Sequence, residues 1–461
     1  MERAYRINGD VIKERIRIIH NNGINQNAGM NGITRFDGIE AEGFAQALNA
    51  YSLEKAVVLV SKRGHFSLKK SGGILGIGNK NVIPIDVNAQ YRMDVIKLSR
   101  IIKDIKKQGK TGIISVVGVA GATETGIVDP LTDIGDICKD HGINFHVDAA
   151  WGGPVMLSEK YSHKLKGIEL ADSVTVDGHK QFFMPMTCGM VFFRDPLAMN
   201  HIAYHSNYVN RQGSVDLGIK TLEGSREANS LILDSALKIM GTKGYALMID
   251  HGIETAKQFA EAIKKRELFE LVTEPELNIL TYRMVPNHIR KSFETADSNE
   301  KRQLNAQLDK INIAVQRKQR ESGKSFVSRT RMNYGGMARE SDKNMVYEID
   351  KKLDNQIIHT SNVMTDNSNE ITHTSNVMTD NSNEITHTSN TMSYNSNTTT
   401  HTSNTIPYNS NETTYKSNNS VACEEIVVLR SVIMNPMTSI TILNEVLDEQ
   451  ERILKNLLKE C

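Results

Sequence analysis

Two charged groups that could act on one small molecule follow two apolar runs in the middle of the chain. The first stretch, 144–153, reads Asn-Phe-His-Val-Asp-Ala-Ala-Trp-Gly-Gly and contains Asp148. The second, 172–180, reads Asp-Ser-Val-Thr-Val-Asp-Gly-His-Lys and ends in His179 and Lys180. Ligands of open α/β sheets bind at the carboxyl ends of the strands, so an acid and an amine placed there can contact the same ligand.

Other polar side chains also follow predicted strands. His65 comes shortly after the apolar run 56–60, and Thr123 follows the run 113–119. A single histidine is more often structural or solvated than functional, so His65 by itself does not identify a site. The glycine-rich run 72–78 lacks both the G-x-G-x-x-G pattern and a Walker lysine, and a strand follows it instead of a helix. We interpret this run as a tight connection from a helix to a strand.

Alternating strands and helices would position these residues. Apolar, β-branched runs predict strands over 56–60, 82–85 and 113–119, and buried strands within 144–153, 172–180 and 188–193. Amphipathic spacing predicts helices over 38–51, 98–110 and 131–138. This order indicates an α/β fold with a mostly parallel, doubly wound sheet and right-handed crossovers.

The second half of the chain predicts a smaller α+β domain. The expected elements are helices over 230–240, 245–266 and 304–315, strands over 276–283, 325–331 and 426–433, and a last helix from Ser439. We therefore expect a large domain over 1–245 and a small C-terminal domain made of 246–332 and 423–461.

A repetitive segment, 333–422, separates the two parts of the small domain. His359, His373, His387 and His401 recur every 14 residues within Asn/Ser/Thr-rich copies. A histidine array for metal or a solenoid is one interpretation. The copies offer almost no aliphatic side chains to bury, however, and cannot offset an ordering entropy of about 1–2 kcal/mol per residue. We expect a disordered insertion that arose by tandem duplication.

Composition favours small-molecule chemistry. The 461 residues carry 55 Lys and Arg against 54 Asp and Glu, so no global charge indicates nucleic acid or a membrane as a partner. The four cysteines are scattered without a metal-binding or disulfide pattern, which fits reduced thiols in a cytoplasmic protein and predicts no metal site. No apolar run has the length of a signal peptide core or a membrane span.

Four motifs resemble the pyridoxal-phosphate-dependent group II amino-acid decarboxylases. They are His146-Val-Asp-Ala-Ala-Trp151, Asp177-Gly-His-Lys180, Ser61-x-x-x-His65 and Leu429-Arg-x-x-x-x-Asn-Pro436. The runs 116–126 and 216–226 most resemble the bacterial enzymes proposed to be aspartate 1-decarboxylases. The resemblance extends from near the start to about Arg331 and again from about Glu424 to the end. It implies the fold of type I pyridoxal-phosphate enzymes.

The resemblance implies a role for each matched residue around pyridoxal 5'-phosphate. Lys180 would form a Schiff base with the cofactor, and Asp148 would pair with the pyridine nitrogen and keep it protonated. His65 would stack on the ring, and Ala150 would pack on its other face; the alternatives are a surface histidine and a core alanine. Thr123 and His179 would lie near the cofactor.

Two further residues would act on the substrate. Arg430 would bind a substrate carboxylate through its planar guanidinium; the alternative is a solvated arginine on an edge strand. A loop tyrosine is expected to deliver the proton that replaces the lost carboxylate. We assign Tyr208 to this role, with Tyr204 as the rival.

The expected function is α-decarboxylation of a small acidic amino acid, L-aspartate to β-alanine before L-glutamate. The family's upstream Gly/Ser-rich phosphate turn and N-terminal dimer-forming segment have no match before residue 35, which predicts an N-terminally truncated member. A homodimer is expected if that region is supplied. Two other hypotheses are a catalytically impaired remnant and an interaction protein that acts through its repeats.

Overall fold

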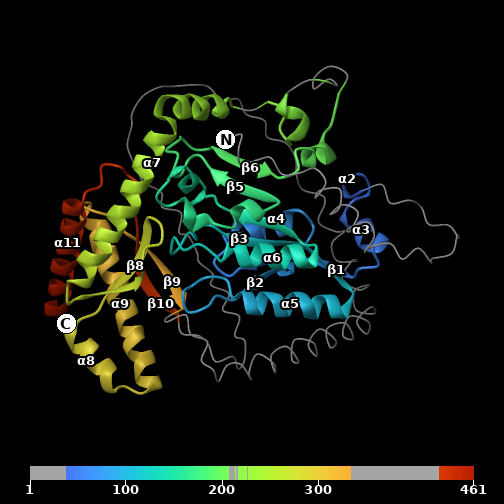
Figure 1. The fold of residues 1–461 in the computed structure, drawn as a ribbon. Coiled ribbons are helices and arrows are strands. Elements are labelled where there is room, and N and C mark those ends of the chain that lie inside the picture. Colours follow the sequence, from blue (N-terminus) through green and yellow to red (C-terminus); the bar gives the residue numbers. More distant parts are fainter. Residues whose placement is uncertain (1–37, 207–212, 214–215, 226, 334–424, 461) are drawn as a thin grey trace, which may run out of the picture. The chain divides into compact units, whose positions relative to one another are not determined.

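The computed structural model describes residues 38–206, 213, 216–225, 227–333 and 425–460 (Figure 1). The candidate Tyr208 and all but the first residue of the predicted insertion therefore lie outside the described residues. The strands are β1 (Lys55–Ser61), β2 (Val82–Ile85), β3 (Thr111–Val119), β4 (Asn144–Asp148), β5 (Ser173–Asp177), β6 (Gly189–Phe193), β7 (Phe269–Thr273), β8 (Ile279–Met284), β9 (Ser328–Asn333) and β10 (Glu425–Val432). The α-helices are α2 (Ile39–Glu42), α3 (Phe44–Ala50), α4 (Ser67–Ile74), α5 (Val95–Gln108), α6 (Leu131–His141), α7 (Asn229–Lys264), α8 (Asn287–Thr295), α9 (Ser298–Ser322) and α11 (Ile440–Glu460).

The larger sheet has the strand order β2-β1-β3-β4-β5-β6. Its first five strands are parallel, and β6 pairs antiparallel with β5. Helices α5 and α6 contact each other and pack on strand β3 (Figure 1). This is the mostly parallel α/β architecture that the alternating sequence pattern predicted.

Local sequence signals explain where helix α5 begins and ends. Asp94 caps α5, since its side chain accepts hydrogen bonds from the backbone N–H groups of Ile96 and Lys97 at 3.0 and 3.1 Å. Gly109 ends the same helix in the left-handed conformation that glycine favours, with φ of 70°. These caps fix α5, which leads directly into strand β3.

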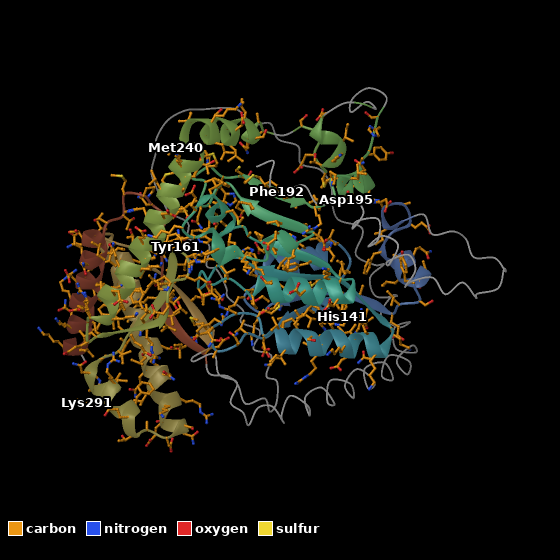
Figure 2. All side chains as sticks on the ribbon, in the orientation of Figure 1. His141, Tyr161, Phe192, Asp195, Met240 and Lys291 are labelled. Carbon is orange, nitrogen blue, oxygen red and sulfur yellow. The ribbon has the colours of Figure 1, made fainter. Side chains whose placement is uncertain are left out.

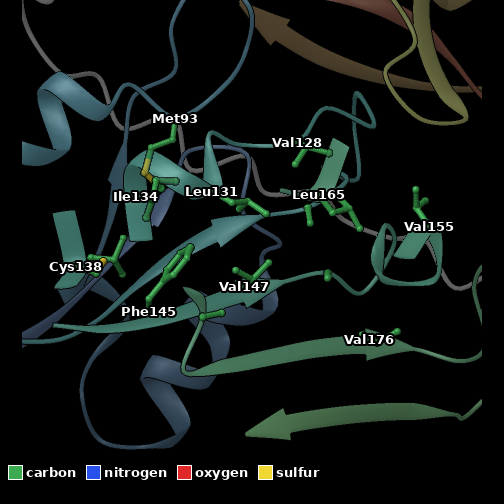
Figure 3. Packing of buried hydrophobic residues seen from close by; sticks show 14 of the residues in the cluster. Met93, Val128, Leu131, Ile134, Cys138, Phe145, Val147, Val155, Leu165 and Val176 are labelled. Carbon is green, nitrogen blue, oxygen red and sulfur yellow. The ribbon is translucent and has the colours of Figure 1, made fainter. Parts of the chain in front are cut away.

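The core of this part lies between the sheet and its helices. Phe145 and Val147 project from β4 beside Leu131, Ile134 and other side chains of the cluster (Figure 3). All four are buried. Because side chains alternate along a strand, burial of Phe145 and Val147 on this face places His146 and Asp148 on the other.

The smaller sheet is antiparallel, with the order β7-β8-β10-β9. Helices α7, α9 and α11 supply apolar residues to its core, which includes Phe259, Tyr282 and Leu447. Strands β8 and β10 are separated by about a third of the chain in sequence but are neighbours in the sheet. The predicted small domain is thus proposed to combine 246–332 with 423–461.

The sequence predictions and the structure differ at β6, β7 and α8. The stretch 188–193 was expected to be a buried strand, but β6 is the antiparallel edge, and Val191, Phe192 and Phe193 are exposed (Figure 2). Strand β7 and helix α8 were not predicted; both are short, with 5 and 9 residues. The two helices predicted over 230–240 and 245–266 are both present as the two parts of α7, which meet at Gly241, whose φ of 63° and ψ of 174° are not helical.

The described helices show no membrane span. None of them combines the length and apolar character that crossing a bilayer requires.

Candidate active site

A cavity of about 270 Å³ lies at the carboxyl ends of β1, β3, β4 and β5. In a parallel sheet of this strand order, the point between β1 and β3 where the direction of winding reverses is where ligands bind. The cavity is lined by Arg63, His65, Ser67, Leu68, Val119, Gly121, Thr123, His146, Asp148, Ala150, Trp151, Thr175, Asp177 and Lys180.

Asp148 and Lys180 both line this cavity, as the spacing of the two central motifs predicted. Asp148 is the last residue of β4, and its Oδ1 accepts a hydrogen bond from the Ala150 backbone N–H at 3.2 Å. Lys180 lies in the turn after β5, and its Nζ is 3.0 Å from Asp177 Oδ2. The carboxylate and the amine therefore come from adjacent strands and share one ligand-sized space.

Three other predicted residues, His65, Thr123 and Ala150, line the same cavity. His65 follows β1, and its Nδ1 is 2.8 Å from Ser67 Oγ, a hydrogen bond that orients the imidazole. Its ring centroid is 4.2 Å from that of Phe66. The alternative of an isolated surface histidine does not describe this position, although the stacking role itself remains a prediction.

The structure places three predicted residues outside the lining. His179 Nδ1 is 2.8 Å from the Cys188 carbonyl oxygen, and its Nε2 is 3.5 Å from Asp177 Oδ2. Arg430 projects from β10 of the smaller sheet, where its Nη1 is 3.3 Å from Ser328 Oγ. Tyr204 is 82% exposed. The roles of all three stay predictions.

His146 also lines the cavity and had no assigned role in the sequence. Its Nδ1 is 2.8 Å from Ser173 Oγ and its Nε2 is 3.2 Å from Thr175 Oγ1. Burial lowers the pKa of His146, and the neighbouring Asp148 carboxylate raises it. The contacts with two hydroxyls orient the His146 imidazole within the lining of the cavity.

The two-residue periodicity of strands could have identified His146 and Thr175 as further cavity residues. His146 precedes Asp148 by two positions, and Thr175 precedes Asp177 by two, so each pair lies on one face of its strand. Trp151 Nε1 donates to Asn278 Oδ1 at 2.8 Å, a contact across 127 residues that no local pattern predicts. Arg63 likewise gave no periodic signal.

The residues present fit the ring and aldehyde of pyridoxal phosphate. One cavity brings together a carboxylate for the pyridine nitrogen, a lysine amine for the aldehyde and an imidazole for the ring face: Asp148, Lys180 and His65. Ser67 and Thr123 add hydroxyls to the lining. This donor set suits a flat heteroaromatic aldehyde better than a metal ion, which requires ligands converging on a single point.

Comparisons with known proteins agree with this chemistry. Residues 40–285 match the family described as the pyridoxal-dependent decarboxylase conserved domain. The chain is 44% identical over 297 residues to an aspartate 1-decarboxylase of Aliivibrio fischeri, covering 64% of this chain and 54% of that protein. It is 34% identical over 255 residues to an L-2,4-diaminobutyrate decarboxylase of Acinetobacter baumannii, covering 54% of this chain and 48% of that protein.

A solved structure shares the fold. The crystal structure of mouse CSAD in apo form superposes with a TM-score of 0.63 at 22% identity, covering 90% of this chain and 66% of that one. The chain spans about half the length of the two curated relatives.

Proposed function

Because the chain belongs to the pyridoxal-dependent decarboxylase family, we propose that it catalyses α-decarboxylation of a small acidic amino acid with pyridoxal 5'-phosphate. The observation that carries the proposal is the single cavity in which Lys180, Asp148 and His65 meet. L-Aspartate is the favoured substrate and L-glutamate the next, since the relative with 44% identity is named an aspartate 1-decarboxylase.

Each predicted cofactor-binding residue has a task in this reaction. The bound cofactor supplies the electron sink that accepts the electron pair left behind by departing carbon dioxide. Lys180 would provide the amine that holds the cofactor, and Asp148 would keep the pyridine nitrogen protonated. His65 and Ala150 would contact the ring. Thr123, in the loop after β3, would lie near the cofactor. His179, whose Nδ1 contacts the Cys188 carbonyl oxygen, would also lie near it.

Substrate handling is assigned to Arg430 and Tyr208. Arg430 binds the carboxylate of the substrate, and Tyr208 protonates the carbon from which carbon dioxide has left. Burial lowers the pKa of Arg430, and the nearby Glu124 carboxylate raises it. A half-buried guanidinium of this kind supports a carboxylate-binding role more than that of a solvated edge arginine.

A self-associating surface is also proposed. Val191 and Phe192 of β6 and Leu231, Ile232 and Ile239 of α7 are exposed apolar side chains, and Phe192 can be seen in Figure 2. Large apolar side chains that are exposed to solvent often mark protein interfaces, so these five residues support an interface with a second copy of the chain. Light scattering after size-exclusion chromatography measures the mass; a monomer at all concentrations contradicts a homodimer.

The test of the function has two steps. The purified chain is mixed with pyridoxal phosphate, reduced with borohydride and digested, and mass spectrometry is expected to find the reduced cofactor on Lys180. Release of carbon dioxide from aspartate, glutamate and diaminobutyrate is then compared. The proposal fails if no cofactor is fixed on Lys180 or if none of the three amino acids is decarboxylated.

Neither of the other two hypotheses gains support. The impaired-remnant hypothesis predicts cofactor loss, which the same borohydride experiment measures. The repeat-mediated interaction hypothesis concerns 333–422, and residues from 334 on lie outside the described structure.

A further inference from the structure

Arg63 is a buried arginine in the wall of the candidate active site. It lies just after β1, two residues before His65, and its side chain is only 7% exposed. Its Nη1 donates to Glu124 Oε2 at 2.7 Å, and its Cζ is 5.6 Å from the ring centroid of Tyr91. Its Nε has no hydrogen-bond partner among the residues that the structure describes.

A second arginine is electrostatically coupled to the same carboxylate. Glu124 raises the pKa of Arg430, against the lowering effect of burial, so the two charges lie close enough to interact. Arg430 Nε is also buried without a partner in the described part of the chain. Glu124 therefore pairs directly with Arg63 and acts on Arg430 only through its charge, and the Nε of each arginine is a buried donor that no described group accepts.

Arg63 and Glu124 differ in their freedom to move. Glu124 lies in the loop after β3, where its side chain is 35% exposed and can turn toward water. Arg63 is enclosed and lines the cavity. A guanidinium has five N–H donors in a fixed plane that matches a carboxylate. This asymmetry makes Arg63 a fixed anion-binding group and Glu124 a partner that can be exchanged.

We propose that Arg63 binds the side-chain carboxylate of an acidic substrate, and that Glu124 occupies this position until the substrate displaces it. The proposal rests on the proposed function, and it names the residue that selects the substrate class. An amino acid without a second carboxylate would find Arg63 already paired and could not replace Glu124. The substrate class would thus be selected in two ways: Arg63 attracts the second carboxylate of the substrate, and Glu124 competes with any weaker ligand for Arg63.

The test uses Trp151, the only tryptophan of the chain, which lines the same cavity. Its fluorescence is followed while the purified full chain is titrated with succinate, a dicarboxylate, or with butyrate, a monocarboxylate of equal carbon number. Succinate is expected to bind more tightly. Arg63→Met should weaken succinate binding by about 10- to 100-fold, the usual effect of losing a charged hydrogen bond, and leave butyrate unchanged.

Glu124→Gln provides the decisive second variant, because it changes an exposed loop residue and keeps its shape. It should strengthen succinate binding several-fold by removing the competing charge. Arg63→Lys, which keeps the charge but not the planar fork, should give intermediate affinity. The matched control is Arg317→Met, which breaks an exposed arginine–glutamate pair on α9 at 3.8 Å and should leave succinate binding unchanged.

Three outcomes overturn the proposal: equal affinity for succinate and butyrate, unchanged succinate binding in Arg63→Met, or a Glu124→Gln variant that loses thermal stability without gaining affinity. The last would make the ion pair purely structural. The titration requires neither cofactor nor turnover. Its failure alongside normal carbon dioxide release would reject only the role of Arg63, and its success without such release would reject only the proposed reaction.

Discussion

Lys180 Nζ lies 3.0 Å from Asp177 Oδ2, so the amine at the cavity is paired with the carboxylate that ends its own strand. His179 Nε2 is 3.5 Å from the same oxygen. Asp177 therefore anchors the turn that carries both residues of the His-Lys pair. Asp148, on the adjacent strand, is left to face the ligand. Asp177 thus positions the amine, which leaves Asp148 for the proposed pairing with the pyridine nitrogen.

The first prediction concerns this lysine. Lys180→Ala should abolish borohydride-fixed cofactor and reduce decarboxylation by at least about a thousandfold, because no other cavity-lining residue supplies an amine that can bond to the aldehyde. Peptide mass spectrometry and carbon dioxide release measure the two effects.

Lys164 provides a stringent control. Burial lowers the pKa of Lys164, so more of its amine is neutral at a given pH than in a solvated lysine, and it is a natural competitor for an aldehyde. It does not line the cavity. Lys164→Ala should keep full labelling at Lys180. Loss of label in the Lys164 variant, with label retained in the Lys180 variant, would reverse the assignment.

The second prediction tests the close packing that shapes the cavity wall. A Cβ added at Gly152 would lie 2.4 Å from the Ala120 carbonyl oxygen, which already accepts a hydrogen bond from the Gly152 N–H at 3.0 Å. Gly152→Ala should lower the free energy of unfolding by about 1–3 kcal/mol, the usual cost of overpacking. Urea unfolding measures it.

The control is another glycine, at a position without steric contact. A Cβ at Gly73, in α4, meets no atom within 4 Å. Gly73→Ala should leave stability unchanged or raise it by up to about 1 kcal/mol, because alanine has the higher helix propensity. Equal stabilities of the two variants would show that the ends of β3 and β4 adjust to a methyl group.

Local patterns predicted most of the elements, and the resemblance assigned Lys180 as the proposed covalent residue. Asp148 and Lys180 were found because each follows a short apolar run, and parallel strands end at one edge. The prediction of a buried strand over 188–193 was wrong, because this run is as apolar as a buried strand and only its pairing partners reveal that β6 is an edge. Arg63 and Trp151 were missed because tertiary contacts, with Glu124 and Asn278, define their positions.

The third prediction distinguishes the two loop tyrosines. Tyr208→Phe should slow formation of the amine product by about a hundredfold, the usual contribution of a general acid, and raise the share of side products. Tyr204 is 82% exposed, and its backbone N–H, rather than its side chain, bonds to Ile219 O at 2.9 Å. Tyr204→Phe should therefore behave as wild type. Chromatography measures the ratio of amine product to side products in each variant. If this ratio is unchanged in Tyr208→Phe, Tyr208 is not the proton donor.

The fourth prediction concerns Asp129, a buried carboxyl group behind the cavity. Its Oδ1 accepts from the Met93 N–H at 2.7 Å and its Oδ2 from the Val119 N–H at 2.9 Å. Burial raises the pKa of Asp129 to about 6, and the two backbone hydrogen bonds and nearby Arg92 only partly oppose this rise. The folded protein therefore holds a proton at pH values where the unfolded chain has already lost it.

The sign of the pH effect follows from this difference. Below the unfolded pKa of 3.8 both states are protonated, and Asp129 adds no pH dependence. Between about pH 4 and 6 only the unfolded state ionises, so stability should fall by about 1.4 kcal/mol per pH unit and then level off. Asp129→Asn cannot titrate there. The difference in unfolding free energy between wild type and variant should therefore change across this window and be constant above it.

Urea unfolding at several pH values from 4 to 7 measures that difference, with Asp133→Asn, which removes an exposed carboxylate from α6, as the control. A constant offset between wild type and Asp129→Asn over the whole range would contradict the prediction. In that case the two backbone N–H donors, one to each oxygen, outweigh burial and keep the carboxylate ionised. Because Val119 also lines the cavity, such an ionised group would add a fixed negative charge directly behind the site.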